Sequence, residues 1–126
     1  LDLAGRPDLR LVTVTMDPEK DTPPVLAGYA KDVARTGSDR WLFLTGPDDV
    51  VQTLIRDGFK VGAQKVANPQ PGQEPFNHTT YLTVVDKKGN ARDHFPAIRG
   101  ANDPDGEKFE AGLARLTKMV ANLLAE

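Results

Sequence analysis

Cysteine is missing from all 126 residues of the chain. Its absence excludes disulfide bonds, thiolate metal sites and thiol catalysis within these residues. Long apolar runs are also missing, since no stretch approaches the roughly 18 to 20 residues that span a bilayer. The chain has no initiator Met and no signal peptide. We therefore expect neither thiol chemistry nor a membrane span from these residues themselves.

An excess of either charge is lacking as well, because 16 Lys and Arg oppose 18 Asp and Glu, for a formal net charge of −2. Without a basic field to hold phosphates, we expect no nucleic-acid partner. The Gly-x-Ser-x-Gly elbow, the phosphate loop and His-Glu-x-x-His are absent, which argues against a hydrolase, a nucleotide-binding protein and a zinc peptidase. The composition, 39% hydrophobic and 27% charged, is typical of a globular protein, and the length predicts one domain over residues 1–126.

The chain does contain two short apolar, partly β-branched segments, residues 9–16 and 41–44. This pattern is typical of strands that are buried on both faces of a sheet. Between them the spacing predicts a helix, with Thr22 as its cap, Pro23 at its first position and Gly37 as its stop. Strands that alternate with helices pair in parallel, so an α/β domain is predicted.

A second helix is expected to begin near Pro47 and to end at Gly58. Two carboxylates in its first turn face the positive end of the helix dipole. We expect the apolar residues of this helix to point inward: Val50, Val51, Leu54 and Ile55. Residues 62–77 are rich in Gly, Pro, Gln and Asn and predict one long loop, which in a compact domain is usually functional or mobile.

Beyond this loop, residues 79–85 and 91–95 predict a hairpin whose turn needs a positive φ at Gly89. The last helix is expected to be capped by Asn102 or Asp103, with Pro104 at or near its first position. Its apolar stripe is formed by Phe109, Leu113, Leu116, Val120, Leu123 and Leu124.

This order of elements is similar to the C-terminal part of a thioredoxin fold, a mixed sheet with flanking helices. In that fold the first strand–helix unit carries the active site. Residues 1–5 resemble only the last turn of such a helix, closed by a glycine. We therefore expect the N-terminal strand–helix unit to be truncated.

The candidate ligand residues are two histidines and one aspartate. His78 lies between the long loop and a hydrophobic strand, where its imidazole can reach the end of the sheet. His94 lies within a strand of alternating polarity, so a structural role is favoured for it. Asp17 follows the first strand, at the end of a parallel sheet where ligands bind, but it can also simply start the turn with Pro18. One imidazole alone does not hold copper tightly, because such sites use two or three donors.

Two weaker patterns occur near these residues. Asp17, Glu19 and Asp21 could together hold a hard cation, but the loop lacks the alternating oxygens and the glycine of a calcium loop. Residues 77–79 match a glycosylation sequon, which is common by chance and receives little weight.

Three stretches in order carry a more specific signal: Val-Thr-Val-Thr-Met-Asp-Pro-Glu-Lys-Asp-Thr at residues 12–22, Phe-Leu-Thr-Gly at 43–46, and His-Thr-Thr-Tyr-Leu-Thr-Val-Val-Asp at 78–86, followed by Gly89. Together they resemble the SCO/SenC family, thioredoxin-like proteins that deliver copper to cytochrome c oxidase. The resemblance covers essentially the whole chain. It implies copper, as Cu(I) or Cu(II), as the bound metal, and the copper-site subunit of the oxidase and other copper chaperones as partners.

In that family two cysteines in Cys-x-x-x-Cys and one distant histidine bind copper, and the histidine matches His78. Asp17 matches an acidic position near the metal loop, where it would support the site or contact a partner. Thiolates favour Cu(I), and an imidazole also accommodates Cu(II). The family is typically held by an N-terminal transmembrane anchor, facing the bacterial periplasm or the mitochondrial intermembrane space. No such anchor is present in these residues.

The missing cysteines are the departure from the family pattern. Either the motif lies upstream of Leu1 or the chain is a natural cysteine-free relative, and the missing opening strand favours the first. The resemblance implies a metallochaperone more than an enzyme, one that delivers copper to the copper site of the oxidase or reduces the cysteines of that site. A thiol-disulfide oxidoreductase of the thioredoxin superfamily, which needs upstream cysteines, and a redox-silent binding module remain the alternatives.

Overall fold

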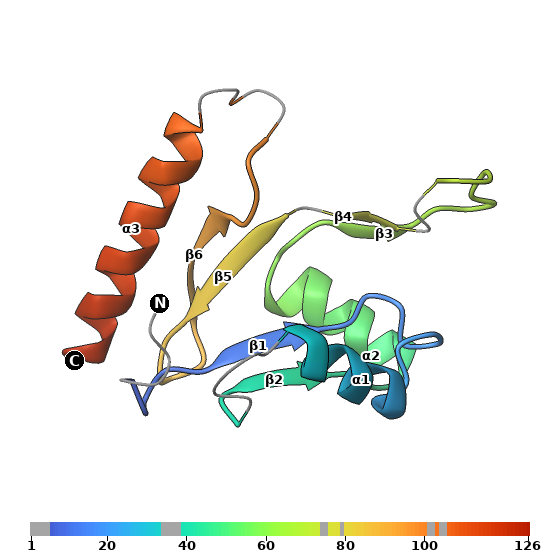
Figure 1. Ribbon diagram of the computed structural model, residues 1–126, viewed down its shortest axis with the longest axis horizontal. Coiled ribbons are helices and arrows are strands. Elements are labelled where there is room, and N and C mark those ends of the chain that lie inside the picture. The colour runs from blue at the N-terminus through green and yellow to red at the C-terminus, as the bar shows by residue number, and fades with distance from the viewer. Residues whose placement is uncertain (1–5, 34–38, 74–75, 79, 101–102, 104–105) are drawn as a thin grey trace. The chain divides into compact units, whose positions relative to one another are not determined.

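The computed structural model describes residues 6–33, 39–73, 76–78, 80–100, 103 and 106–126 (Figure 1). The chain forms two compact units, Leu1–Asp57 and Gly58–Glu126. None of the helices in the described ranges is long and apolar enough to cross a membrane.

The first unit contains a pair of parallel strands joined through a helix. Strand β1 (Leu11–Val14) pairs in parallel with β2 (Trp41–Leu44), as the strand–helix–strand pattern predicts. Helix α1 (Pro23–Val33) lies between them in the chain, and the carbonyl of Thr22 accepts the N–H of Leu26 at 3.0 Å. The predicted start of this helix is therefore confirmed.

The apolar stripe of α1 is only partly covered. Leu26, Ala30 and Val33 are half-buried, whereas Val25 and Tyr29 are 51% and 54% exposed. The Tyr29 ring meets Phe43 of β2 edge-on, with ring centroids 5.7 Å apart. The predicted stop of this helix, Gly37, lies outside the described residues.

The second predicted helix contains two different kinds of turn. Helix α2 (Asp48–Thr53) begins after Pro47, whose extended backbone (φ −56°, ψ 139°) ends the preceding loop. The chain then continues as a π-helical segment, η1 (Leu54–Gly58). A single regular helix up to Gly58 is therefore wrong, although the end point is right.

Two of the four apolar residues assigned to the inner face of this segment are in fact exposed. Val51 and Ile55 are 4% and 6% exposed, but Val50 and Leu54 are 57% and 39% exposed. Residues four apart share one helix face, so Val51 and Ile55 lie on one face and Val50 and Leu54 on a neighbouring one. Within the described part of the first unit, only the face with Val51 and Ile55 is buried.

The second unit contains the predicted hairpin. Strand β5 (Tyr81–Val85) pairs antiparallel with β6 (Ala91–Pro96), with an irregularity between Val84 and Val85. Gly89 has a φ of 85°, which confirms the turn. The Asp86 carboxylate accepts the N–H groups of Lys88 and Asn90, both at 2.9 Å. These bonds, chiefly from Asn90, lower the pKa of Asp86 to about 2.

The predicted long loop is partly a second hairpin. Strands β3 (Ala63–Lys65) and β4 (Phe76–His78) pair antiparallel, so residues 62–77 are not one irregular segment. Each strand has only three residues, and the residues between them are rich in Pro and Gly. A pattern this short carries no detectable strand periodicity, which explains the error.

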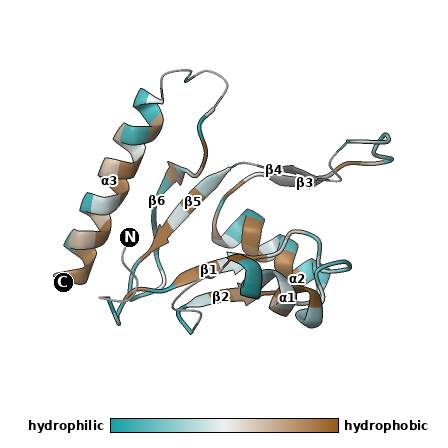
Figure 2. Ribbon diagram, viewed as in Figure 1, coloured by the Kyte–Doolittle hydropathy of each residue, from teal (hydrophilic) through white to brown (hydrophobic). Residues whose placement is uncertain are grey.

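Helix α3 (Glu107–Leu124) packs against β6 of the β5–β6 hairpin. Its Leu116 and Val120 are buried, as is Phe95 of β6, which is fully inaccessible. A Cβ built on Gly112 would lie 2.9 Å from Pro96 Cγ, so helix and strand approach closely. Polar and apolar residues alternate along α3 (Figure 2), in agreement with the predicted stripe.

The helix starts later than predicted, at Glu107, after Gly106 with a φ of 75°. Asp103 nevertheless caps it, because its carboxylate accepts the N–H groups of Lys108 and Phe109 at 3.1 and 2.8 Å. Asn102 and Pro104 lie outside the described residues.

Candidate functional site

Strand β4 places the predicted copper ligand. His78 is its last residue and lies opposite Ala63 of β3 in the antiparallel register. Strand β5 begins three residues later, at Tyr81. His78 is thus positioned between the loop that joins β3 to β4 and a longer strand, and its side chain lies outside what the structure describes. Its role as a ligand remains a prediction.

Asp17 lies in a tight loop after β1, in the first unit. Its carbonyl accepts the N–H groups of Lys20 and Asp21 at 3.1 and 2.9 Å, which closes the loop. Its carboxylate Oδ2 lies 3.3 Å from Lys20 Nζ, and its side chain is 19% exposed. The carboxylate is therefore partly accessible and partly engaged by a flexible surface lysine.

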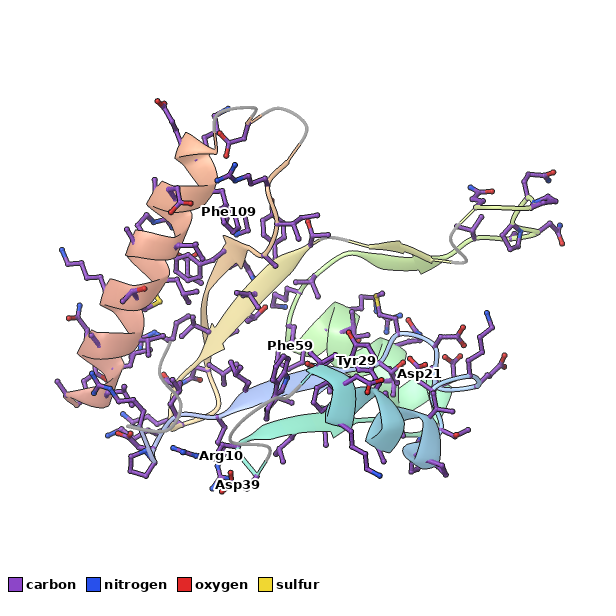
Figure 3. The ribbon with its side chains drawn as sticks, viewed as in Figure 1. Arg10, Asp21, Tyr29, Asp39, Phe59 and Phe109 are labelled. Atoms are coloured by element: carbon purple, nitrogen blue, oxygen red, sulfur yellow. The ribbon has the colours of Figure 1, made fainter. Side chains whose placement is uncertain are left out.

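A buried hydroxyl holds this loop in place. Thr15 is 6% exposed, and its Oγ1 accepts the Asp17 N–H at 2.9 Å and donates to Asp21 Oδ2 at 2.5 Å. Asp21 is labelled in Figure 3. The Thr15 N–H donates to the Leu44 carbonyl at 3.0 Å, so the anchor is itself fixed to β2. The sequence interpretation missed Thr15, although a threonine two residues before an Asp-Pro turn is a usable signal for such a bond.

The loop after β1 is also bonded to α2, through Gln52. Gln52 Nε2 donates to the Met16 carbonyl at 3.1 Å and to Asp48 Oδ1 at 3.2 Å. Gln52 was likewise missed, because its partner on the loop is a backbone oxygen that leaves no trace in the sequence. Together Thr15 and Gln52 hold the N–H and the carbonyl of the peptide bond between Met16 and Asp17.

His94 has the structural setting that the sequence favours. It is half-buried on β6, and its Nδ1 lies 3.0 Å from Thr83 Oγ1 on β5. The neighbouring Asp93 accepts the His94 N–H at 2.8 Å and an Arg115 N–H at 2.9 Å. These contacts lower the pKa of Asp93, the His94 N–H being the largest cause. They join β5, β6 and α3.

The described residues do not assemble a metal site by themselves. No group of three or more His, Asp or Glu side chains that could hold an ion occurs among them, and the chain has no Cys. The structure brings Asp17 together with Thr15, Lys20 and Asp21 in the first unit, while His78 belongs to the second. The donor set present does not fit tightly held copper, because that ion takes two or three soft or imidazole donors.

Comparison with solved structures defines the fold. The chain is similar to a SCO1/SenC family lipoprotein from Bacillus anthracis str. Ames, with a TM-score of 0.65 and 23% identity over 94% of this chain and 61% of that one. It is also similar to yeast Sco1 with copper bound, with a TM-score of 0.58 and 25% identity over 87% of this chain and 54% of that one. The protein is an α/β protein of the thioredoxin-like class, as predicted.

Sequence comparison places it within that class. The SCO1/SenC family model matches residues 2–108, so the chain belongs to the SCO1/SenC family. An SCO2-like protein of Rickettsia prowazekii (strain Madrid E) is 30% identical over 89 residues, 70% of this chain. The match spans 41% of the length of that relative.

Proposed function

We propose that this protein is a copper metallochaperone that delivers copper to the copper site of cytochrome c oxidase during its assembly. The observation that carries the proposal is the SCO1/SenC match over residues 2–108. A relative of the same fold, yeast Sco1, has been solved with copper bound. Under this proposal copper is cargo, and the copper-site subunit of the oxidase and other copper chaperones are its partners.

His78 is proposed to supply the imidazole ligand. It is the last residue of β4, opposite Ala63 of β3, and β5 begins three residues later, at Tyr81. Because the chain contains no cysteine, any thiolate donors of the site must come from outside these residues. Thiolates bind Cu(I) strongly, and the imidazole extends binding to Cu(II).

Asp17 is proposed to support the site or to contact a partner, rather than to bind copper. Its loop is fixed by Thr15 and Gln52, so its carboxylate has a defined position at the end of β1. A proposed location on the periplasmic side of the bacterial inner membrane, or in the mitochondrial intermembrane space, follows from the family. Fractionation of cells that express the full-length protein tests it.

The absence of cysteine specifically favours a second candidate, a redox-silent thioredoxin-like binding module. Such a module would keep the fold and the partner contacts and bind no copper. A copper titration of the full-length protein separates the two candidates, because only the metallochaperone holds copper in stoichiometric amount.

The decisive variant is His78→Ala in the full-length protein. We expect it to weaken Cu(II) binding at least about tenfold, because a copper site of three donors loses one of them. The matched control is His94→Ala, which removes the other histidine of the chain and one contact between β5 and β6. In a copper titration, the Cu(II) affinity of the His94→Ala variant should stay within about twofold of that of the wild type. An equal loss in both variants would reject His78 as the ligand.

A further inference from the structure

The peptide bond between Met16 and Asp17 is held at both of its polar ends. Thr15 Oγ1 accepts the Asp17 N–H at 2.9 Å, and Gln52 Nε2 donates to the Met16 carbonyl at 3.1 Å. Because a peptide unit is planar, two hydrogen bonds at its opposite ends prevent the whole plane from rotating. The dihedral angle φ of Asp17 is thereby restrained.

The peptide bond on the other side of Asp17 is held as well. The Asp17 carbonyl accepts the N–H groups of Lys20 and Asp21 at 3.1 and 2.9 Å. The next residue is Pro18, whose ring locks its own φ. With both neighbouring peptide units held, the direction in which the Asp17 side chain leaves the backbone is fixed.

The bonds that orient Asp17 are made by its peptide groups. By contrast, Asp86 and Asp103 use their carboxylates to accept backbone N–H groups. The Asp17 carboxylate lies 3.3 Å from Lys20 Nζ, and the side chains of Asp17 and Lys20 are 19% and 72% exposed. An ion pair with so exposed a lysine is weak. The Asp17 carboxylate is thus oriented by its backbone while it remains partly accessible.

Gln52 holds this loop from a different element. It lies on α2, 36 residues after Met16, whereas the other contacts come from within residues 15–21. Its amide is itself oriented, because Nε2 also donates to Asp48 Oδ1 at 3.2 Å, one helical turn earlier. An amide that donates to two acceptors has its nitrogen and oxygen ends defined. Asp48 and Gln52 together therefore couple the orientation of Asp17 to α2.

We propose that Gln52 is a positioning residue for the delivery of copper, and that it acts by keeping the Asp17 carboxylate in a single orientation. The inference rests on the proposed function, because it needs the role that is proposed there for Asp17. Without the Gln52 donor the Met16–Asp17 peptide can rotate, and the carboxylate takes several directions. Carboxylate oxygen is a hard donor that Cu(I) does not favour. Gln52 therefore affects how fast copper is transferred and not how tightly it is held.

The test follows copper transfer by stopped-flow spectroscopy, from the copper-loaded full-length protein to the purified soluble copper-site domain of cytochrome c oxidase. Gln52→Met keeps nearly the shape of glutamine but lacks the donor. It should slow transfer about fivefold, the size expected for one lost hydrogen bond. Gln52→Lys keeps an N–H donor and should stay within about twofold of wild type. A separate titration should find the copper affinity of both variants within about twofold of wild type.

A double-mutant cycle with Asp17→Asn distinguishes positioning from a general structural role. Asp17→Asn alone should slow transfer about fivefold or more. In that background Gln52→Met should slow transfer further by less than about twofold, because the carboxylate that Gln52 orients is already neutral. An unchanged rate in either single variant, or a full loss from Gln52→Met in both backgrounds, would overturn the positioning role and leave the copper function standing.

The matched pair Asp48→Ala and Asp49→Ala tests the same contact without altering Gln52. Both variants remove a carboxylate from the first turn of α2, so they lose the same interaction with the helix dipole. Asp48→Ala also removes the acceptor of the Gln52 amide and should slow transfer about threefold, with Asp49→Ala within about twofold of wild type. Equal slowing by both would overturn the positioning role. A wild type that holds no copper, or holds it without transferring it, would instead overturn the proposed function, and the positioning role with it.

Discussion

At the scale of single residues, the geometry around Asp17 depends on one buried hydroxyl. Thr15 accepts the Asp17 N–H and donates to the Asp21 carboxylate, and it is the one buried polar residue among those the structure describes. Its backbone is fixed by Leu44 on the neighbouring strand. A change that removes only the hydroxyl therefore tests how the loop is held without disturbing the sheet.

We expect Thr15→Val to lower the free energy of unfolding of the full-length protein by about 1–3 kcal/mol. Valine has almost the shape of threonine, but it leaves the Asp17 N–H and the Asp21 carboxylate without this partner in a half-buried loop. Urea unfolding measures the change. The control Thr53→Val replaces an exposed threonine on α2 and should alter stability by less than about 0.5 kcal/mol. Equal effects would show that Thr15 does not anchor the loop.

The sequence was sufficient to place Asp17 but not to explain its setting. A strand followed by Asp-Pro locates the residue at a strand end, and the structure has it there. The hydroxyl of Thr15 and the amide of Gln52 act on this loop from a strand and a helix that only the fold brings together. Such partners depend on tertiary structure, so a local pattern does not reveal them.

At the scale of elements, two glycines in helices have opposite surroundings. A Cβ on Gly112 of α3 would lie 2.9 and 3.0 Å from Pro96 Cγ and Cδ, both in a rigid ring. A Cβ on Gly28 of α1 would meet no atom within 4 Å. Alanine is the better helix former at both positions by about 1 kcal/mol. The difference in unfolding free energy between Gly112→Ala and Gly28→Ala therefore measures the effect of the close contact between α3 and β6.

We expect Gly112→Ala to destabilise the protein by about 1–3 kcal/mol, because the overlap with Pro96 exceeds the gain in helix propensity. Gly28→Ala should stabilise it by about 0.5–1 kcal/mol. Thermal and urea unfolding measure both. Stabilisation by both substitutions would mean that α3 can shift away from Pro96 without cost.

Long periodic segments were predictable at this scale and short ones were not. The stripe of α3, the largely apolar run of β5 and the alternating polarity of β6 each extend over enough residues to be recognised, and all three elements are present. Strands β3 and β4 have three residues each and were not predicted. The π-helical segment η1 was missed because the apolar residues at 50, 51, 54 and 55 have the spacing of one ordinary helix across the junction with α2.

At the scale of the whole molecule, family membership is shown by these residues, whereas copper binding is a proposal that needs donors which they do not contain. The SCO1/SenC match covers residues 2–108, but the chain spans only 41% of the Rickettsia relative. The fold and the family could be predicted from the strand–loop motifs at residues 12–22, 43–46 and 78–86. Of the proposed copper site, the sequence predicts one ligand, His78, and it contains no cysteine to complete the site.

The 126-residue chain on its own is therefore expected to hold no copper against a strong Cu(I) chelator. Its two histidines lie in different settings, one at the end of β4 and one beside Thr83, and Cu(I) prefers thiolates to imidazoles. The measurement is a competition titration at equal concentrations of protein and chelator, with the full-length protein as the reference. Stoichiometric copper retained by the 126 residues would reveal a donor set other than His78 and would require that the copper ligands of this protein be assigned again.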